Sequence, residues 1–157
     1  MIDAKRRILL KGSLAAGSVG VAVAAGLLTP RLVLAEWNAA AFESKDVSAA
    51  LKGLLGSDAM ETNDAVVVKA PDIAENGAVV PVTVETTLSD ISYIAIIASG
   101  NATPLVASFA LGAAAMPFVS TRIKMGKTAD VVAVVKQGDK LFSNAKNVKV
   151  TIGGCGG

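Results

Sequence analysis

The chain has 157 residues, enough for one domain of ordinary size, and its 15 basic and 13 acidic residues give a formal net charge of +2. It contains no histidine and a single cysteine, which excludes a Ser-His-Asp site, a Cys-His site and an internal disulfide. After residue 35 its charge pattern shows neither a nucleic-acid footprint nor a basic amphipathic surface for membranes.

The N-terminal region has the three-part layout of an export signal. A basic start that includes Arg6 and Arg7 precedes an apolar, glycine-rich stretch over 14–28, and a cleavage site of small residues ends at Ala35. The Arg6-Arg7 pair is typical of the twin-arginine route. We therefore predict that residues 1–35 are removed and that the mature protein is periplasmic. The alternative is a retained membrane anchor, but the stretch is too short and too rich in glycine for a span of about 20 residues.

Removal of this signal reverses the sign of the net charge. Residues 1–35 hold five of the 15 basic residues and one of the 13 acidic residues, so 10 basic and 12 acidic residues remain. The mature chain is therefore weakly acidic, and the basicity of the precursor belongs to its export signal.

The mature chain begins with a helical pattern. Apolar residues recur at helical spacing over 47–55, with Ser44 as the expected N-cap and Gly56 as the expected stop. Trp37 and Phe42 precede this helix. They cover a sheet edge, contact a partner, or pack on the core of their own domain, and the sequence leaves these interpretations open.

From residue 65 onward the pattern predicts short strands separated by turn residues, and thus an all-β sandwich domain over 36–152. Pro81 cannot donate to a ladder, so its strand is expected at a sheet edge or with a bulge. The expected strands are 65–69, 77–87, 91–98, 104–111, 119–125, 131–136, 141–142 and 148–152.

Two of these strands, 93–98 and 131–135, are apolar on both faces. Antiparallel sandwiches usually leave one face of each strand in water. Either the N-terminal helix lies across the sheet, or a second protein chain docks on it. We favour the partner chain, because one short helix covers only part of a sheet.

The last strand runs directly into residues 153–157, a glycine-rich arm that presents the only thiol. Extended residues span about 3.3–3.6 Å each, so the sulfur can stand roughly 10 Å from the sandwich. No cation or helix N-terminus adjoins the thiol, and the terminal carboxylate disfavours the thiolate. We therefore predict that Cys155 is a site of covalent cargo attachment and not a catalytic residue. The flexible arm that carries it is made of Gly153, Gly154, Gly156 and Gly157.

Three other interpretations of the tail remain. It is a tail without function, or Cys155 cross-links two copies of the chain in an oxidising compartment. The terminal Gly156-Gly157 also matches ubiquitin-like sulfur carriers, which carry sulfur as a thiocarboxylate. That chemistry needs nucleotide activation and a smaller fold, so it fits an exported sandwich poorly.

The run 148–157, Val-Lys-Val-Thr-Ile-Gly-Gly-Cys-Gly-Gly, closely resembles the C-terminus of the SoxY family, the sulfur-carrier subunits of the periplasmic thiosulfate-oxidising (Sox) system. The twin-arginine signal, the opening at 37–42 and the stretch 121–125 are similar to that family too. The resemblance implies an immunoglobulin-like sandwich in a heterodimer with a SoxZ-like subunit. It also implies that Cys155 carries sulfur intermediates covalently.

The same resemblance implies that other proteins supply the chemistry. A c-type cytochrome enzyme joins thiosulfate to the thiol, a manganese-dependent hydrolase releases sulfate, and a molybdenum–haem dehydrogenase oxidises the remaining sulfane sulfur where it is present. This chain would then be a carrier without cofactor or metal, not an enzyme. The alternative is an exported structural or adhesion sandwich whose Cys155 forms an intermolecular disulfide.

Overall fold

The computed structural model describes residues 38–152, which belong to one compact unit and form two short helices followed by nine strands. The helices are α2 (Ala39–Glu43) and α3 (Val47–Leu55). The strands are β1 (Met60–Thr62), β2 (Val66–Lys69), β3 (Ile73–Ala74), β4 (Val80–Thr86), β5 (Ile91–Ala98), β6 (Leu105–Ala110), β7 (Phe118–Ile123), β8 (Ala129–Gln137) and β9 (Lys140–Val150). None of the helices within 38–152 is long and apolar enough to cross a membrane.

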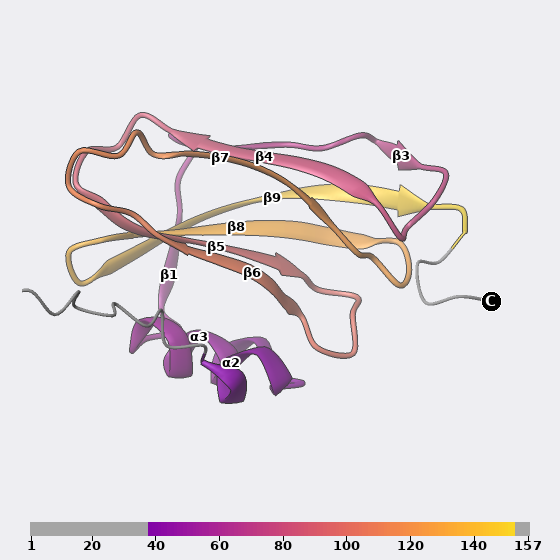
Figure 1. Ribbon diagram of the computed structural model, residues 1–157, viewed down its shortest axis with the longest axis horizontal. Coiled ribbons are helices and arrows are strands. Elements are labelled where there is room, and N and C mark those ends of the chain that lie inside the picture. Colours follow the sequence, from indigo (N-terminus) through magenta and orange to yellow (C-terminus); the bar gives the residue numbers. More distant parts are fainter. Residues whose placement is uncertain (1–37, 153–157) are drawn as a thin grey trace, which may run out of the picture. The chain divides into compact units, whose positions relative to one another are not determined.

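The strands form two sheets that pack face to face, and the helices lie on the outer side of the larger sheet (Figure 1). The larger sheet has the order β1-β9-β8-β5-β6, with β3 also paired to β9, and the smaller sheet has the order β2-β4-β7. Within each sheet the long strands pair antiparallel. The prediction of an all-β, immunoglobulin-like antiparallel sandwich with N-terminal helical structure is confirmed.

The main core fills the space between the two sheets. The smaller sheet contributes alternate residues of β4, since Val80, Val82 and Val84 are buried while Pro81 is exposed. This alternation is the period of two that strands impose on their side chains. The larger sheet supplies Ile94, Ile96, Val131, Ala133 and Val135 to the same cluster.

A second core lies between the larger sheet and the helices. Leu51 and Leu55 of α3 pack against residues of β5 and β8 that point away from the main core, namely Ala95, Ile97 and Val134. The helices therefore cover the second apolar face of these two strands. This overturns our preference for a partner chain on that face, because α2 and α3 together bury what one helix alone could not.

Phe42 belongs to this helical cover and is half-buried against the second cluster. Of the interpretations offered for the two aromatic residues, packing on the domain's own core is the one that holds for Phe42. Trp37 lies outside the described residues.

The helix ends differ in part from expectation. The N-cap of α3 is Asp46, whose carboxylate accepts from Ala49 N–H at 2.8 Å, so the prediction of Ser44 was wrong. Ser44 instead donates to the Asp46 carbonyl at 3.0 Å. Gly56 ends the helix as predicted, because it adopts the left-handed conformation with φ +84°. The five-residue helix α2, capped by Asn38, was not predicted.

Two strand predictions also need correction. Residues 141–142 and 148–152 were expected as separate strands, but β9 runs unbroken from Lys140 to Val150 along β8. The strand of Pro81 was expected at an edge or with a bulge, whereas β4 is the central strand of its sheet and pairs with β7 without a register shift. The β2–β4 pairing nevertheless ends at Lys69 and Thr83, so Pro81 lies beyond the end of β2.

Candidate functional site

The residues predicted to carry function lie outside the part of the chain that the structure describes. This holds for Cys155 and its glycines Gly153, Gly154, Gly156 and Gly157, and for Arg6 and Arg7 of the predicted signal. The structure does describe the two residues that directly precede the predicted arm, Thr151 and Ile152. The candidate site is therefore built from the residues that hold these two and surround them.

On one side, the last residues of β9 are held by the segment from Asp72 to Gly77. Strand β3 pairs parallel with β9, placing Ile73 opposite Lys149 and Ala74 opposite Val150. The pairing continues beyond β9, because Thr151 N–H donates to the Ala74 carbonyl at 3.1 Å and Gly77 N–H donates to the Ile152 carbonyl at 2.8 Å. The Thr151 hydroxyl also donates to the Glu75 carbonyl at 3.0 Å.

On the other side, the connection from β7 to β8 closes on the same point. Thr128 Oγ1 accepts from Val150 N–H at 2.9 Å and donates to the Val150 carbonyl at 3.3 Å. Met125 N–H donates to the Gly77 carbonyl at 2.7 Å, which joins this connection to the segment after β3. Hydrogen bonds from two loops thus hold the end of β9, and they fix the position of the chain up to Ile152.

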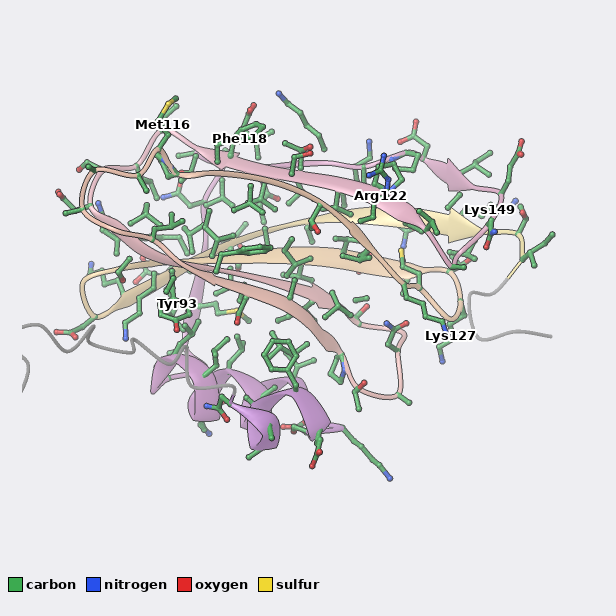
Figure 2. All side chains as sticks on the ribbon, in the orientation of Figure 1. Tyr93, Met116, Phe118, Arg122, Lys127 and Lys149 are labelled. Carbon is green, nitrogen blue, oxygen red and sulfur yellow. The ribbon has the colours of Figure 1, made fainter. Side chains whose placement is uncertain are left out.

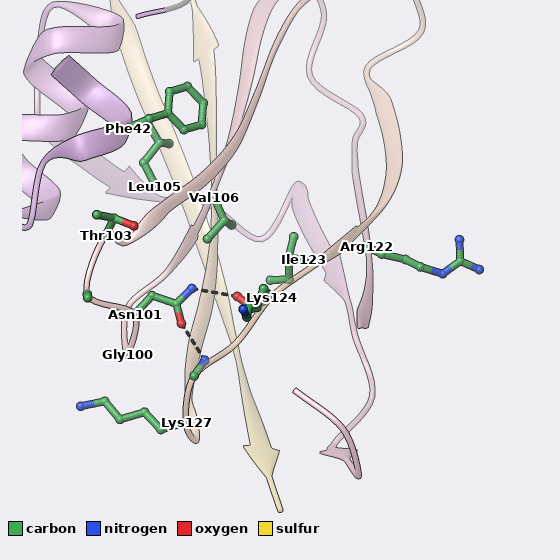
Figure 3. A pocket seen from close by; sticks show the side chains of 12 residues that line it. Phe42, Gly100, Asn101, Thr103, Leu105, Val106, Arg122, Ile123, Lys124 and Lys127 are labelled. Atoms are coloured by element: carbon green, nitrogen blue, oxygen red, sulfur yellow. Dashed lines mark hydrogen bonds between the residues drawn. The ribbon is translucent and has the colours of Figure 1, made fainter. Parts of the chain in front are cut away.

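Asn101 holds the clamping loop in place (Figure 3). Its side-chain amide donates to the Lys124 carbonyl at 2.7 Å, and its oxygen accepts from Gly126 N–H at 2.8 Å. This one side chain therefore ties the β5–β6 turn to the β7–β8 connection. The sequence identified the turn at 99–101 but gave no signal for this contact, because it joins residues 23 to 25 positions apart.

Within residues 38–152, six of the seven exposed large apolar residues form two groups at opposite ends of the sandwich, and the seventh, Met60, lies in β1. Ile73, Val79 and Ile152, with exposures of 57%, 55% and 67%, surround the exit of the tail. Val67, Met116 and Phe118 lie at the other end, where Figure 2 shows the latter two far from the end of β9. A hollow of about 250 Å³ adjoins this second group.

Three exposed lysines accompany the apolar group at the exit. Lys149 pairs with Ile73 in the β3–β9 ladder, Lys127 precedes the clamping Thr128, and Lys124 follows Ile123, which pairs with Val80. Figure 2 shows Lys127 and Lys149 at this end of the molecule. Within residues 38–152 the ion pairs are Lys52–Asp58, Lys69–Glu85 and Lys146–Asp72, so none of these three lysines has a carboxylate partner there.

A cavity of about 750 Å³ opens beside the clamping loop (Figure 3). Its walls are mainly apolar, from Phe42, Leu105, Val106 and Ile123, and Asn101 crosses its lower part. Its charged lining residues are Arg122, Lys124 and Lys127, all basic. The end of the sandwich from which the tail leaves is therefore concave and positively charged on this side.

Residues 38–152 contain no cluster of histidine, cysteine, aspartate or glutamate that could hold a metal ion. Hydrogen bonds from Ser48 and then Lys52 lower the pKa of Asp58 below its ordinary value. That carboxylate joins the first turn of α3 to the segment before β1, which is a structural role.

Comparison with known proteins defines the class of protein. The family model "Sulfur oxidation protein SoxY" matches residues 51–155, more than half of the chain, and the matched range ends at Cys155. The chain therefore belongs to the SoxY family.

One solved structure agrees with that assignment. The structure of the sulfur carrier protein SoxY from Chlorobium limicola f thiosulfatophilum is similar, with 44% identity and a TM-score of 0.60 over 66% of this chain and 94% of that one. A superoxide reductase (neelaredoxin) from Ignicoccus hospitalis shares 18% identity with a TM-score of 0.49, over 55% of this chain and 80% of that one. No curated protein matches the chain.

Proposed function

We propose that this protein carries sulfur intermediates of thiosulfate oxidation covalently on Cys155 and presents them to partner enzymes. The observation that supports this most is the fixed exit of the tail. Hydrogen bonds hold Thr151 and Ile152 on the sandwich, and Cys155, the only cysteine of the sequence, follows three residues after Ile152. Membership of the SoxY family and the likeness to a solved sulfur carrier protein support the same role.

The proposed loading step is an oxidation. The Cys155 thiol and thiosulfate join through a new S–S bond, giving a Cys–S–S–SO₃⁻ adduct, one proton and two electrons. A c-type cytochrome enzyme accepts the two electrons. The carrier itself needs no acid or base for this step, which suits a chain without histidine.

The proposed release step is a hydrolysis. Water attacks the terminal sulfur, sulfate and two protons leave, and a persulfide stays on Cys155. A manganese-dependent hydrolase performs this step, and a molybdenum–haem dehydrogenase oxidises the sulfane sulfur where it is present. We propose Gly153, Gly154, Gly156 and Gly157 as a swinging arm that reaches the active sites of these enzymes.

We further propose that the protein works in the periplasm, in a heterodimer with a SoxZ-like subunit, after twin-arginine export directed by Arg6 and Arg7. Because α2 and α3 cover one face of the larger sheet, the partner subunit must bind elsewhere. Co-purification of the tagged protein from periplasmic extract tests the heterodimer. A protein that purifies alone would overturn it.

The alternative is an exported structural or adhesion sandwich in which Cys155 makes a disulfide between two copies. Intact-mass spectrometry and non-reducing gels of the protein taken from cells that oxidise thiosulfate distinguish the two. A carrier shows a mixture of adduct masses on one cysteine, whereas a structural dimer is cross-linked throughout. A population that is entirely cross-linked would contradict the carrier role.

A further inference from the structure

The length of the arm restricts where an enzyme can approach, and this inference rests on the proposed carrier function. Cys155 lies three residues beyond Ile152, and extended residues span about 3.3–3.6 Å each, so its sulfur stays within roughly 10 Å of the sandwich. An enzyme that receives the thiol in a channel must therefore place the mouth of that channel against the end of the sandwich where β9 stops.

This end of the sandwich has an apolar centre. Ile152 is the last described residue, and its carbonyl accepts from Gly77 N–H. Ile73 lies in the strand that pairs with the end of β9, and Val79 follows two residues after Gly77. All three side chains are more than half exposed. Protein interfaces commonly have an apolar centre that is surrounded by polar residues.

Around this centre the charge is mainly positive. Lys124, Lys127 and Lys149 are exposed and have no carboxylate partner in the described region. Two nearby acidic residues lie outside ion pairs: Glu75, whose carbonyl accepts from Thr151, and Asp130, whose carboxylate accepts from the Asn147 side chain. Asp72 pairs with Lys146. The excess of positive charge stands out because the mature chain as a whole is weakly acidic.

We propose that this end of the sandwich is the docking surface for the enzymes that act on the arm, and that it fits a channel mouth that is apolar and rimmed by acidic residues. We name it the exit surface and define it by Ile73, Val79, Ile152, Lys124, Lys127 and Lys149. The apolar centre packs against the channel mouth, while the lysines steer the encounter and set its orientation.

The second exposed apolar group cannot serve this purpose. Phe118 is separated from Ile123 by the length of β7, five steps of about 3.3 Å, which exceeds the reach of the arm. An enzyme seated on Met116 and Phe118 would therefore hold its channel too far from Cys155. These residues supply a matched apolar control.

The charge of the exit surface is tested with Lys124→Glu/Lys127→Glu and the control Lys45→Glu/Lys140→Glu, which makes the same charge change at exposed lysines elsewhere. Each mature protein, in complex with its partner subunit, is loaded by the purified conjugating cytochrome at saturating thiosulfate. We expect the KM for the carrier to rise about tenfold in the exit variant at low salt, and this difference to shrink as salt screens exposed charges. The control should keep the wild-type KM.

The apolar centre is tested in the same assay with Ile73→Ser/Val79→Ser against the matched control Met116→Ser/Phe118→Ser. We expect a higher KM for the first variant and the wild-type value for the second. Thermal unfolding and the rate of Cys155 alkylation by iodoacetamide verify that each variant is folded with its thiol accessible. Equal KM values for exit variants and controls overturn this inference alone, whereas a wild-type protein that acquires no adduct overturns the carrier function and this inference with it.

Discussion

The side-chain hydroxyl of Thr128 forms hydrogen bonds with both backbone polar groups of Val150, the last residue of β9. The hydroxyl accepts from Val150 N–H at 2.9 Å and donates to the Val150 carbonyl at 3.3 Å. This side chain therefore takes the place of β8, whose pairing with β9 ends at Ala129 and Val148, while β3 pairs with Val150 as well. The contact sets the position from which residues 153–157 begin.

Replacing this hydroxyl should loosen the exit of the tail. Thr128→Val keeps the shape of the side chain and removes both hydrogen bonds, so we expect the free energy of unfolding to fall by about 1 kcal/mol. Urea denaturation measures this change, and hydrogen exchange at Val150 N–H should become faster. Thr103→Val, an exposed threonine in the neighbouring loop, is the control. Unchanged exchange at Val150 would show that Thr128 does not hold the strand end.

Gly100 is a site where a single methyl group should disturb the clamp. A Cβ at this position would stand 2.7 Å from Ala129 Cβ and 3.1 Å from Lys127 Cγ. We expect Gly100→Ala to lower the free energy of unfolding by about 1–3 kcal/mol, since overpacking forces the backbone to shift.

The control for this clash is Gly112→Ala, because nothing lies within 4 Å of a Cβ at Gly112. Both substitutions restrict the unfolded chain in the same way, so the difference between them isolates the clash. Equal stabilities of the two variants in urea denaturation would refute it.

The carboxylate of Asp58 should make stability depend on pH in the acid range. Hydrogen bonds from Ser48 and Lys52 lower its pKa in the folded state, and the Lys52 ammonium lies 3.1 Å away. A lowered folded pKa adds stability that is complete above the unfolded pKa, about 3.9, and is lost as the pH falls through the folded pKa. The advantage of the wild type over Asp58→Asn should thus be constant near neutrality and shrink below about pH 4. Melting temperatures of both proteins across this range test it, and a constant difference would contradict it.

The arm itself should tolerate little added bulk. Because the proposed arm enters enzyme channels, Gly154→Val/Gly156→Val should slow loading by the conjugating cytochrome without changing the melting temperature. Both glycines lie outside the described residues and belong to the proposed arm, so the melting temperature serves as the internal control. Wild-type loading rates in this variant would show that the arm does not need to enter a narrow channel.

Much of the fold could be predicted because its signals are local. The alternation of Val80, Val82 and Val84 marks a strand with one buried face, and Gly56 and Gly138 stop or turn the chain with positive φ. The apolar runs in β5 and β8 also indicated that both faces of these strands are covered. What the sequence did not show was which element covered them, because a contact between α3 and β5 joins residues some forty positions apart.

The remaining errors have a similar cause. Strands β1 and β3 are two or three residues long and exist only through parallel pairing with β9, which leaves no periodic pattern. The residues 143–147 of β9 include Ser143, Asn144 and Asn147, which are typical of turns. Here the two asparagine side chains donate to the Val66 carbonyl and the Asp130 carboxylate, and the strand continues.

The same distinction applies to the candidate site. The tail residues are recognisable from composition alone, since one cysteine stands between two pairs of glycines. The hydrogen bonds around the exit could not be predicted, because each joins residues that are far apart in the sequence. The pairs are Thr128 with Val150, Asn101 with Lys124, and Gly77 with Ile152.

The carrier role is tested most directly by the intact mass of the protein after incubation with thiosulfate and the conjugating cytochrome. We predict that the wild type gains the mass of one S₂O₃ group, and that Cys155→Ser keeps its fold and its partner subunit but gains nothing. A wild-type protein of unchanged mass, or the same adduct on Cys155→Ser, would contradict the account.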